Sequence, residues 1–193
     1  GLSITSVGGQ VMFGTTTPSV LMGINNAANT GVNLPLFMFG ANGALKPDFG
    51  QIVIGNAAQT GAMFIGTNAQ TLTYTSPLVV QNPSGTGTIT LAGTITDTAS
   101  YPSSFSVLAG GRIVDTTAAK VSVVTNGAAV LLNANTSSDA TTVLGGIDLF
   151  GSIATTGGNI SLGGGKAGNA SGYATGDGSF VGVALESGAS LTA

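Results

Sequence analysis

The residues able to do acid–base chemistry are few in this sequence, and they stand far apart. Four residues are basic: Lys46, Arg112, Lys120 and Lys166. Seven are acidic: Asp48, Asp97, Asp115, Asp139, Asp148, Asp177 and Glu186. Neighbouring acids are at least nine residues apart, so we interpret most of them as side chains that cap turns. Neither His nor Cys occurs, which removes the usual imidazole base and the commonest zinc ligands.

Motifs that hold phosphates or build nucleophiles are also missing. The sequence has no G-x-S-x-G, no Walker loop and no G-x-G-x-x-G after a strand. We therefore predict no catalytic residue, no cofactor and no metal site, and a protein that is not an enzyme. A β-helical enzyme acting on carbohydrate is the alternative. It would need three or more acids that converge in one groove with Arg112, Lys120 or Lys166.

Composition points to a neutral, polar surface. Charged residues make up 6% of the chain, hydrophobic residues 42%, and 32 residues are Gly, with a net charge of −3. Nucleic-acid binding requires a dense basic stripe that neutralises phosphates, so we predict no nucleic-acid partner. The same shortage of Lys and Arg argues against docking on anionic membranes. Hydroxyls and amides must therefore cover the surface instead of ions.

The secondary-structure elements that must position these residues are predicted to be short β-strands. Apolar residues do not recur at helical spacing, whereas β-rich runs of three to six residues, bounded by Gly, Asn, Pro or Ser, recur throughout. About twenty such runs are too many for an immunoglobulin-like sandwich. We predict an all-β chain folded as a parallel β-helix, a β-solenoid of about eight or nine coils with roughly 20–24 residues each.

One stretch of sequence shows a turn-and-strand pattern that recurs along the chain. Thr155–Leu162 reads T-T-G-G-N-I-S-L, and Thr125–Leu132 reads T-N-G-A-A-V-L-L. When Leu132 is placed over Leu162, Val130 falls on Ile160. We interpret the shared turn as a structural corner formed by Gly127, Gly157, Gly158 and Asn159. The inward positions should be the alternating aliphatics Ile52, Ile54, Ile89, Leu91, Ile147, Leu149, Ile160, Leu162, Val181 and Val183.

The chain divides into two regions by regularity. Residues 1–49 hold three prolines and a bulky L-P-L-F-M-F run, and we expect either larger, less ideal coils or a loop packed over the rod. Residues 50–193 carry the regular repeats. Gly163–Asp177 is long and Gly-rich, as are loops that project from solenoids and bind ligands. Its candidate binding residues are Lys166, Asn169, Tyr173 and Asp177. A solvated loop without a ligand is the other interpretation.

Several phrases resemble a known family. Thr155–Gly165, T-T-G-G-N-I-S-L-G-G-G, looks like the repeated unit of filamentous-haemagglutinin-like adhesins, the large exoproteins of Gram-negative two-partner secretion systems. Gly50–Gly61, followed by Asn82–Thr96, is similar to another recurring phrase of that class, and Gly145–Leu162 fits the same pattern. The resemblance covers roughly residues 50–193 and consists of a shared pattern of repeats.

The resemblance implies a right-handed parallel β-helix that is exported through an outer-membrane transporter to the cell surface or the medium. It also implies roles in attachment, aggregation or biofilm, with a host or bacterial surface receptor or a polysaccharide as partner. Secretion domains of the family usually carry N-P-N-G and then an aliphatic, whereas this chain has Asn82-Pro83-Ser84-Gly85 and then Thr86. We therefore expect a piece of the stalk, excised from a longer protein. A surface fibre that assembles by self-association is a further alternative.

Overall fold

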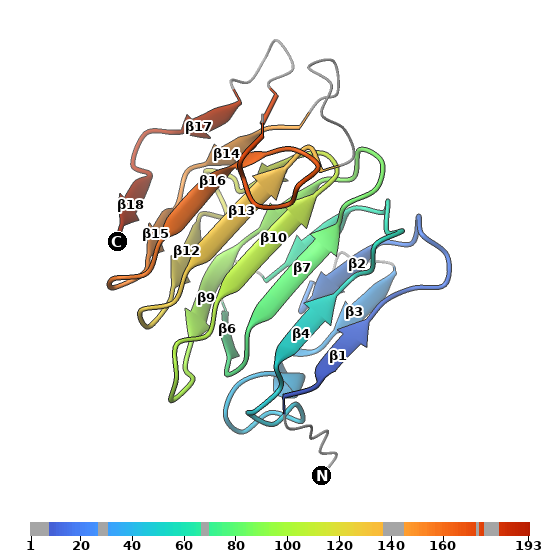
Figure 1. Cartoon of the computed structure of the whole chain (residues 1–193), viewed down its shortest axis with the longest axis vertical. Helices are drawn as coiled ribbons and strands as arrows, with labels where there is room; N and C mark the ends of the chain where they lie inside the picture. Colours follow the sequence, from blue (N-terminus) through green and yellow to red (C-terminus); the bar gives the residue numbers. More distant parts are fainter. Residues whose placement is uncertain (1–7, 27–30, 67–69, 137–144, 173, 176–181) are drawn as a thin grey trace.

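Three parallel β-sheets form the described part of the chain in this computed structural model (Figure 1). The structure describes residues 8–26, 31–66, 70–136, 145–172, 174–175 and 182–193. Within these residues the one helical element is η1 (Leu36–Met38), a single 3-10 turn. Every pairing between the named strands is parallel. The prediction of an all-β chain is confirmed.

From β4 onward the chain visits the three sheets in turn, which supplies the long crossover that a parallel strand pair needs. The first sheet comprises, in spatial order, β1 (Gln10–Phe13), β4 (Gln51–Ile54), β7 (Leu78–Asn82), β10 (Phe105–Ala109), β13 (Val130–Ala134) and β16 (Ile160–Gly164). The second comprises β17 (Val183–Leu185), β14 (Ile147–Leu149), β11 (Ile113–Val114), β8 (Ile89–Leu91), β5 (Met63–Ile65), β2 (Met22–Ile24) and β3 (Val32–Leu34). The third comprises β18 (Ser190–Thr192), β15 (Ser152–Ala154), β12 (Val121–Val124), β9 (Gly93–Asp97) and β6 (Thr71–Tyr74). This three-sheet stack is consistent with a parallel β-solenoid.

One round through the three sheets is longer than the sequence pattern suggested. In the first sheet Leu78 pairs with Phe105, which is 27 residues further along the chain. Phe105 pairs with Val130 after 25 residues, and Val130 pairs with Ile160 after 30. The expected period of 20–24 residues is therefore too short, because the connections between sheets add residues. Among the described residues the first sheet has six strands.

The core lies between the three sheets and is built from side chains that pair in register. Ile54, Val80, Val107 and Leu132 follow one another across the first sheet, and each is fully buried. Alternate residues of a strand point to opposite faces, so each strand contributes every second side chain to this interior. The inward positions predicted at Ile52, Ile54, Ile89, Leu91, Ile147 and Leu149 are confirmed, with 2% exposure or less.

The predicted inward positions near the last strands are less enclosed. Ile160 and Leu162 are half-buried and pack against the core from one side. Val183 is 37% exposed, because β17 is the outermost strand of the second sheet and pairs with β14 alone. Val181 lies outside the described residues. The missing neighbour leaves side chains exposed at this end of the stack, whereas Leu72 on β6, the outermost strand of the third sheet, is 1% exposed.

The first 49 residues contribute both strands and a turn-rich segment. β1 and β2 pair with β4 and β5, so they occupy the same two sheets as the later strands. The segment after β3 contains η1 and sends Phe39, Leu45 and Phe49 into the core, at 5%, 1% and 4% exposure. This segment lies beside the start of β4 (Figure 1).

Inward side chains that pair in register from round to round form what we call a rank. Truncating a member in the interior of a rank should lower the free energy of unfolding far more than truncating one on an outermost strand. Leu132 is fully buried, so Leu132→Ala should lower the free energy of unfolding by about 2–5 kcal/mol through lost transfer energy and a cavity. Leu185 is 48% exposed on β17, and Leu185→Ala should cost less than about 1 kcal/mol. Urea titrations monitored by circular dichroism measure both. Equal costs would contradict the stacked core.

Candidate functional site

The predicted corner repeat is a pair of stacked turns between the third and first sheets. Val130 pairs with Ile160 and Leu132 with Leu162, in the register expected from the sequence. Thr125 is fully buried, and its hydroxyl donates to the carbonyl of Ala128 at 2.5 Å. Thr155 is also fully buried and makes the equivalent bond to the carbonyl of Gly158. Each hydroxyl closes its own turn.

The three corner glycines lie where backbone geometry or space is restrictive. Gly127 has φ 80° and Gly157 has φ 108°, backbone angles that side chains rarely adopt. A Cβ on Gly158 would lie 2.2 Å from the carbonyl oxygen of Ala128. Asn159 is exposed, and its carbonyl accepts the N–H of Val130 at 2.9 Å. These residues shape the turns, and their contacts go to the neighbouring round of backbone.

The predicted binding loop is tied to the first sheet along its described part. Asn133 is fully buried on β13, and its amide donates to the carbonyl of Gly165 at 2.9 Å and accepts the N–H of Ala170 at 2.6 Å. Lys166 and Asn169 are exposed on this loop. The side-chain oxygen of Asn169 accepts the N–H of Ser171 at 3.1 Å, so it serves the loop's own turn. Tyr173 and Asp177 lie outside the described residues.

Three acids and one arginine interact electrostatically at the second sheet. The pKa of Asp148 is raised, mainly because the carboxyl group is buried. The nearby charges of Glu186 and Asp115 raise it further, whereas Arg112 lowers it. Asp148 is 9% exposed in the middle of β14, and one carboxylate oxygen has no hydrogen-bond partner.

Asp115, in contrast, is a structural clasp that is 2% exposed. Its two carboxylate oxygens accept the N–H groups of Val121 at 2.8 Å and Phe150 at 2.6 Å, which joins two rounds of the chain. Both oxygens are therefore engaged with backbone. Within the described residues no three acids are placed to hold a metal ion.

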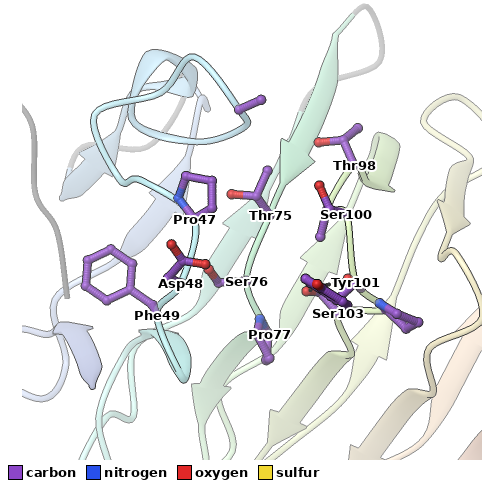
Figure 2. Close-up of a pocket in the computed structure, with 13 residues that line it drawn as sticks. Pro47, Asp48, Phe49, Thr75, Ser76, Pro77, Thr98, Ser100, Tyr101 and Ser103 are labelled. Atoms are coloured by element: carbon purple, nitrogen blue, oxygen red, sulfur yellow. Dashed lines mark hydrogen bonds between the residues drawn. The ribbon is translucent and has the colours of Figure 1, made fainter. Parts of the chain in front are cut away.

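A cavity of about 350 Å³ opens at the corner where three successive connections enter the first sheet. Ala41 and the segments 47–49, 75–77 and 98–103 line it, and we call it the corner cavity. Segment 47–49 lies on one side, 98–103 on the other and 75–77 between them (Figure 2). These segments precede β4, β7 and β10, which are consecutive neighbours in the first sheet. Pairing of those strands therefore sets the spacing of the cavity walls.

The wall formed by residues 98–103 is held by buried polar groups beneath it. Asp97, 6% exposed at the end of β9, accepts the N–H groups of Ala99 and Ser103, each at 2.9 Å. The hydroxyl of fully buried Tyr74 donates to the carbonyl of Ser103 at 3.2 Å. Burial and then the charge of Asp97 raise the pKa of Tyr74 well above its usual range, so Tyr74 stays a protonated donor. The loop that carries Tyr101 is thereby fixed.

The floor and rim of the corner cavity differ in polarity. Phe49 and Ser76 are buried at 4% and 1% exposure, and the Ser76 hydroxyl has no hydrogen-bond partner. Tyr101 stands on the rim, 82% exposed. Asp48 is also exposed, and its φ of 87° is unusual for a residue other than glycine. A buried unpaired hydroxyl beside an exposed ring and a carboxylate is suited to a small polar ligand.

Sequence reasoning did not identify the corner cavity. Of its lining residues, Asp48 enters the sequence-based predictions as one of the acids, most of which we interpret as turn caps. The one shared signal is Pro47, Pro77 and Pro102, each just before a strand of the first sheet. Their distances to those strands differ, so the repeat pattern does not align them.

The two buried acids at the second sheet, Asp148 and Asp115, should respond to amidation in opposite ways. The folded-state pKa of Asp148 is raised, so its ionised form costs stability as the pH rises above the ordinary carboxyl pKa. Asp148→Asn should therefore raise the urea midpoint at pH 7, and this gain should vanish near pH 3. The matched control, Asp115→Asn, should lose about 2 kcal/mol at pH 7 because a backbone N–H loses its acceptor. A less stable Asp148→Asn protein at pH 7 would refute the assignment.

Comparisons with known proteins leave the family open. No helix among the described residues is both long and apolar enough to cross a membrane. Searches of protein-family models, curated proteins and solved structures return no match to this chain.

Proposed function

We propose that this chain is a right-handed parallel β-helical segment of a secreted or cell-surface fibrous adhesin, whose task is attachment, aggregation or biofilm formation. The main observation in support of this proposal is the stack of three sheets. Its buried side chains continue in register from round to round, as in the series Ile54, Val80, Val107 and Leu132. Such a stack lengthens by adding rounds, which suits a stalk. Right-handedness follows the strong preference of parallel crossovers.

We propose about six rounds in place of the eight or nine expected from the sequence, because rounds of 25–30 residues are longer than the expected 20–24 and the first sheet has six strands among the described residues. The family phrase Thr155–Gly165 begins at the corner after β15 and runs through β16, so the resemblance falls on a stacked corner and an adjoining strand. A Gram-negative origin, export through an outer-membrane transporter and a surface receptor or polysaccharide as partner are parts of the same proposal.

The distribution of acids supports binding over carbohydrate cleavage. Glycoside hydrolysis uses two carboxyl groups on either side of the bond that breaks. The corner cavity is lined by one acid, Asp48. The acids near Arg112 do not line that cavity, and Asp115 among them has both oxygens bound to backbone. Three acids do gather near Arg112, as the enzyme alternative requires, but they lie outside the corner cavity and Asp115 is engaged with backbone, so the arrangement favours binding.

Attachment can be measured directly on beads coated with the chain. Coated latex beads should adhere to epithelial cells or to bacterial lawns under flow in greater number than albumin-coated beads. Excess soluble chain should reduce that adhesion by competition. Beads that adhere no better than albumin beads to any surface tested would overturn the proposal.

Self-association is a second candidate, favoured by apolar side chains on the outermost strands. Val183 and Leu185 on β17 and Leu191 on β18 are 37%, 48% and 39% exposed. Outermost strands also present unpaired backbone groups that can pair with another chain.

If this face mediates assembly, light scattering of the purified chain should show a mass that grows with concentration. Leu185→Lys should abolish that growth, whereas Met12→Lys, at an exposed residue on β1, should abolish it only if the two ends meet. A constant monomeric mass across the concentration range would exclude self-association as the function.

A further inference from the structure

We infer that the corner cavity binds a neutral saccharide, with Tyr101 as the stacking platform and Asp48 and Ser76 as hydrogen-bonding partners. The inference rests on the proposed attachment function, of which it names the ligand class and the site. It starts from a built cavity, because three connections meet there and the wall that carries Tyr101 is fixed from below by Asp97 and Tyr74.

Charge excludes the acidic ligands first. Among the residues that line the cavity, Asp48 is the one charged side chain, and no Lys or Arg is present. A phosphate, sulfate or uronate would meet a carboxylate without a cation to neutralise it. The ligand must therefore be uncharged where it contacts the wall near Asp48.

The polar inventory then favours a ligand rich in hydroxyl groups. Six lining residues carry hydroxyls: Thr75, Ser76, Thr98, Ser100, Tyr101 and Ser103. The hydroxyls of Thr98 and Ser103 already donate to the carbonyls of Tyr74 and Tyr101, so they are left as acceptors. The other hydroxyls can both donate and accept, and a carboxylate such as that of Asp48 accepts. Sugar hydroxyls match both kinds of partner. The Ser76 hydroxyl is buried and unpaired, so it is a group whose hydrogen bond a ligand would supply.

The exposed ring provides the apolar part of the recognition. Tyr101 is 82% exposed, and its loop is held by two hydrogen bonds to Asp97, so little ordering remains to be done on binding. One face of a pyranose ring presents C–H groups, which pack on an aromatic face. The volume of about 350 Å³ lies at the lower end of small-ligand pockets and suits one or two sugar rings.

A peptide is less well matched to this cavity. Peptides bind in extended form by pairing with a free strand edge. Here the walls are three separate connections that enter β4, β7 and β10, and those strands are paired with neighbours on both sides. The cavity therefore presents side-chain hydroxyls more than a continuous row of backbone donors.

The test is a glycan microarray probed with the labelled chain, followed by NMR titration of the ¹⁵N-labelled chain with the strongest binders up to about 10 mM. Neutral oligosaccharides should bind, and amide shifts should concentrate in segments 47–49, 75–77 and 98–103. Tyr101→Ala should weaken affinity about tenfold, whereas Tyr101→Phe should retain most of it. Asp48→Asn, which tolerates the same backbone angle, should also weaken binding.

The matched control is Phe37→Ala, at an exposed aromatic residue that does not line the cavity, and it should bind as the parent does. No binding by neutral glycans, selective binding of acidic glycans, or tight binding of a peptide library in the cavity would each overturn the inference. Beads coated with Tyr101→Ala that adhere as well as the parent would overturn it too, while leaving the attachment function standing. Glycan binding without bead adhesion would overturn attachment alone.

Discussion

Register between successive rounds is the constraint on which the rest of this structure depends. A strand of two to five residues cannot bury its own inward side chains, so each needs a neighbour whose aliphatic residues lie at the same position along the strand. Val107, for example, lies between Val80 and Leu132 and is fully buried. Val183 has a paired strand on one side and is 37% exposed. A shift by one residue would turn every such side chain outward.

The corners hold that register with polar groups that bind backbone. Asp97, Asp115, Asn133, Thr125 and Thr155 are all buried, and each makes hydrogen bonds to main-chain N–H or carbonyl groups of a turn or a neighbouring round. The free-energy cost of burying a carboxylate is offset here because backbone N–H donors replace the water that it loses. This use explains how a chain with few charges still places acids inside. Asp148, whose oxygen lacks such a donor, is the exception.

The fold class was readable from the sequence because its causes are local. Alternation at Ile147 and Leu149, turn glycines at Gly127 and Gly157, and the absence of helical spacing all act within a few residues. The pairing of Leu132 with Leu162 followed from the same local grammar. The length of a round was misjudged, because it depends on connections such as 98–104 whose residues do not repeat.

The corner cavity was not readable, for a related reason. Its walls come from three connections that differ in length and in the offset between proline and strand, so no pattern links Asp48 to Tyr101 before the strands are paired. The different hydrogen bonding of the acids near Arg112 could not be predicted from the sequence either. Whether a carboxylate meets two N–H groups, as Asp115 does, or none at one oxygen, as Asp148 does, is decided by distant backbone.

The shortness of β11 has a mechanical consequence. Strand hydrogen bonds in such a stack run roughly along its length, so a pull on the two ends loads the ladders of the three sheets together. At this round the second sheet is held by two residues, Ile113 and Val114, whereas β10 contributes five to the first sheet and β12 four to the third. Resistance to bending is therefore uneven. The stack should yield first by opening on its β11 side, with the first sheet acting as the hinge.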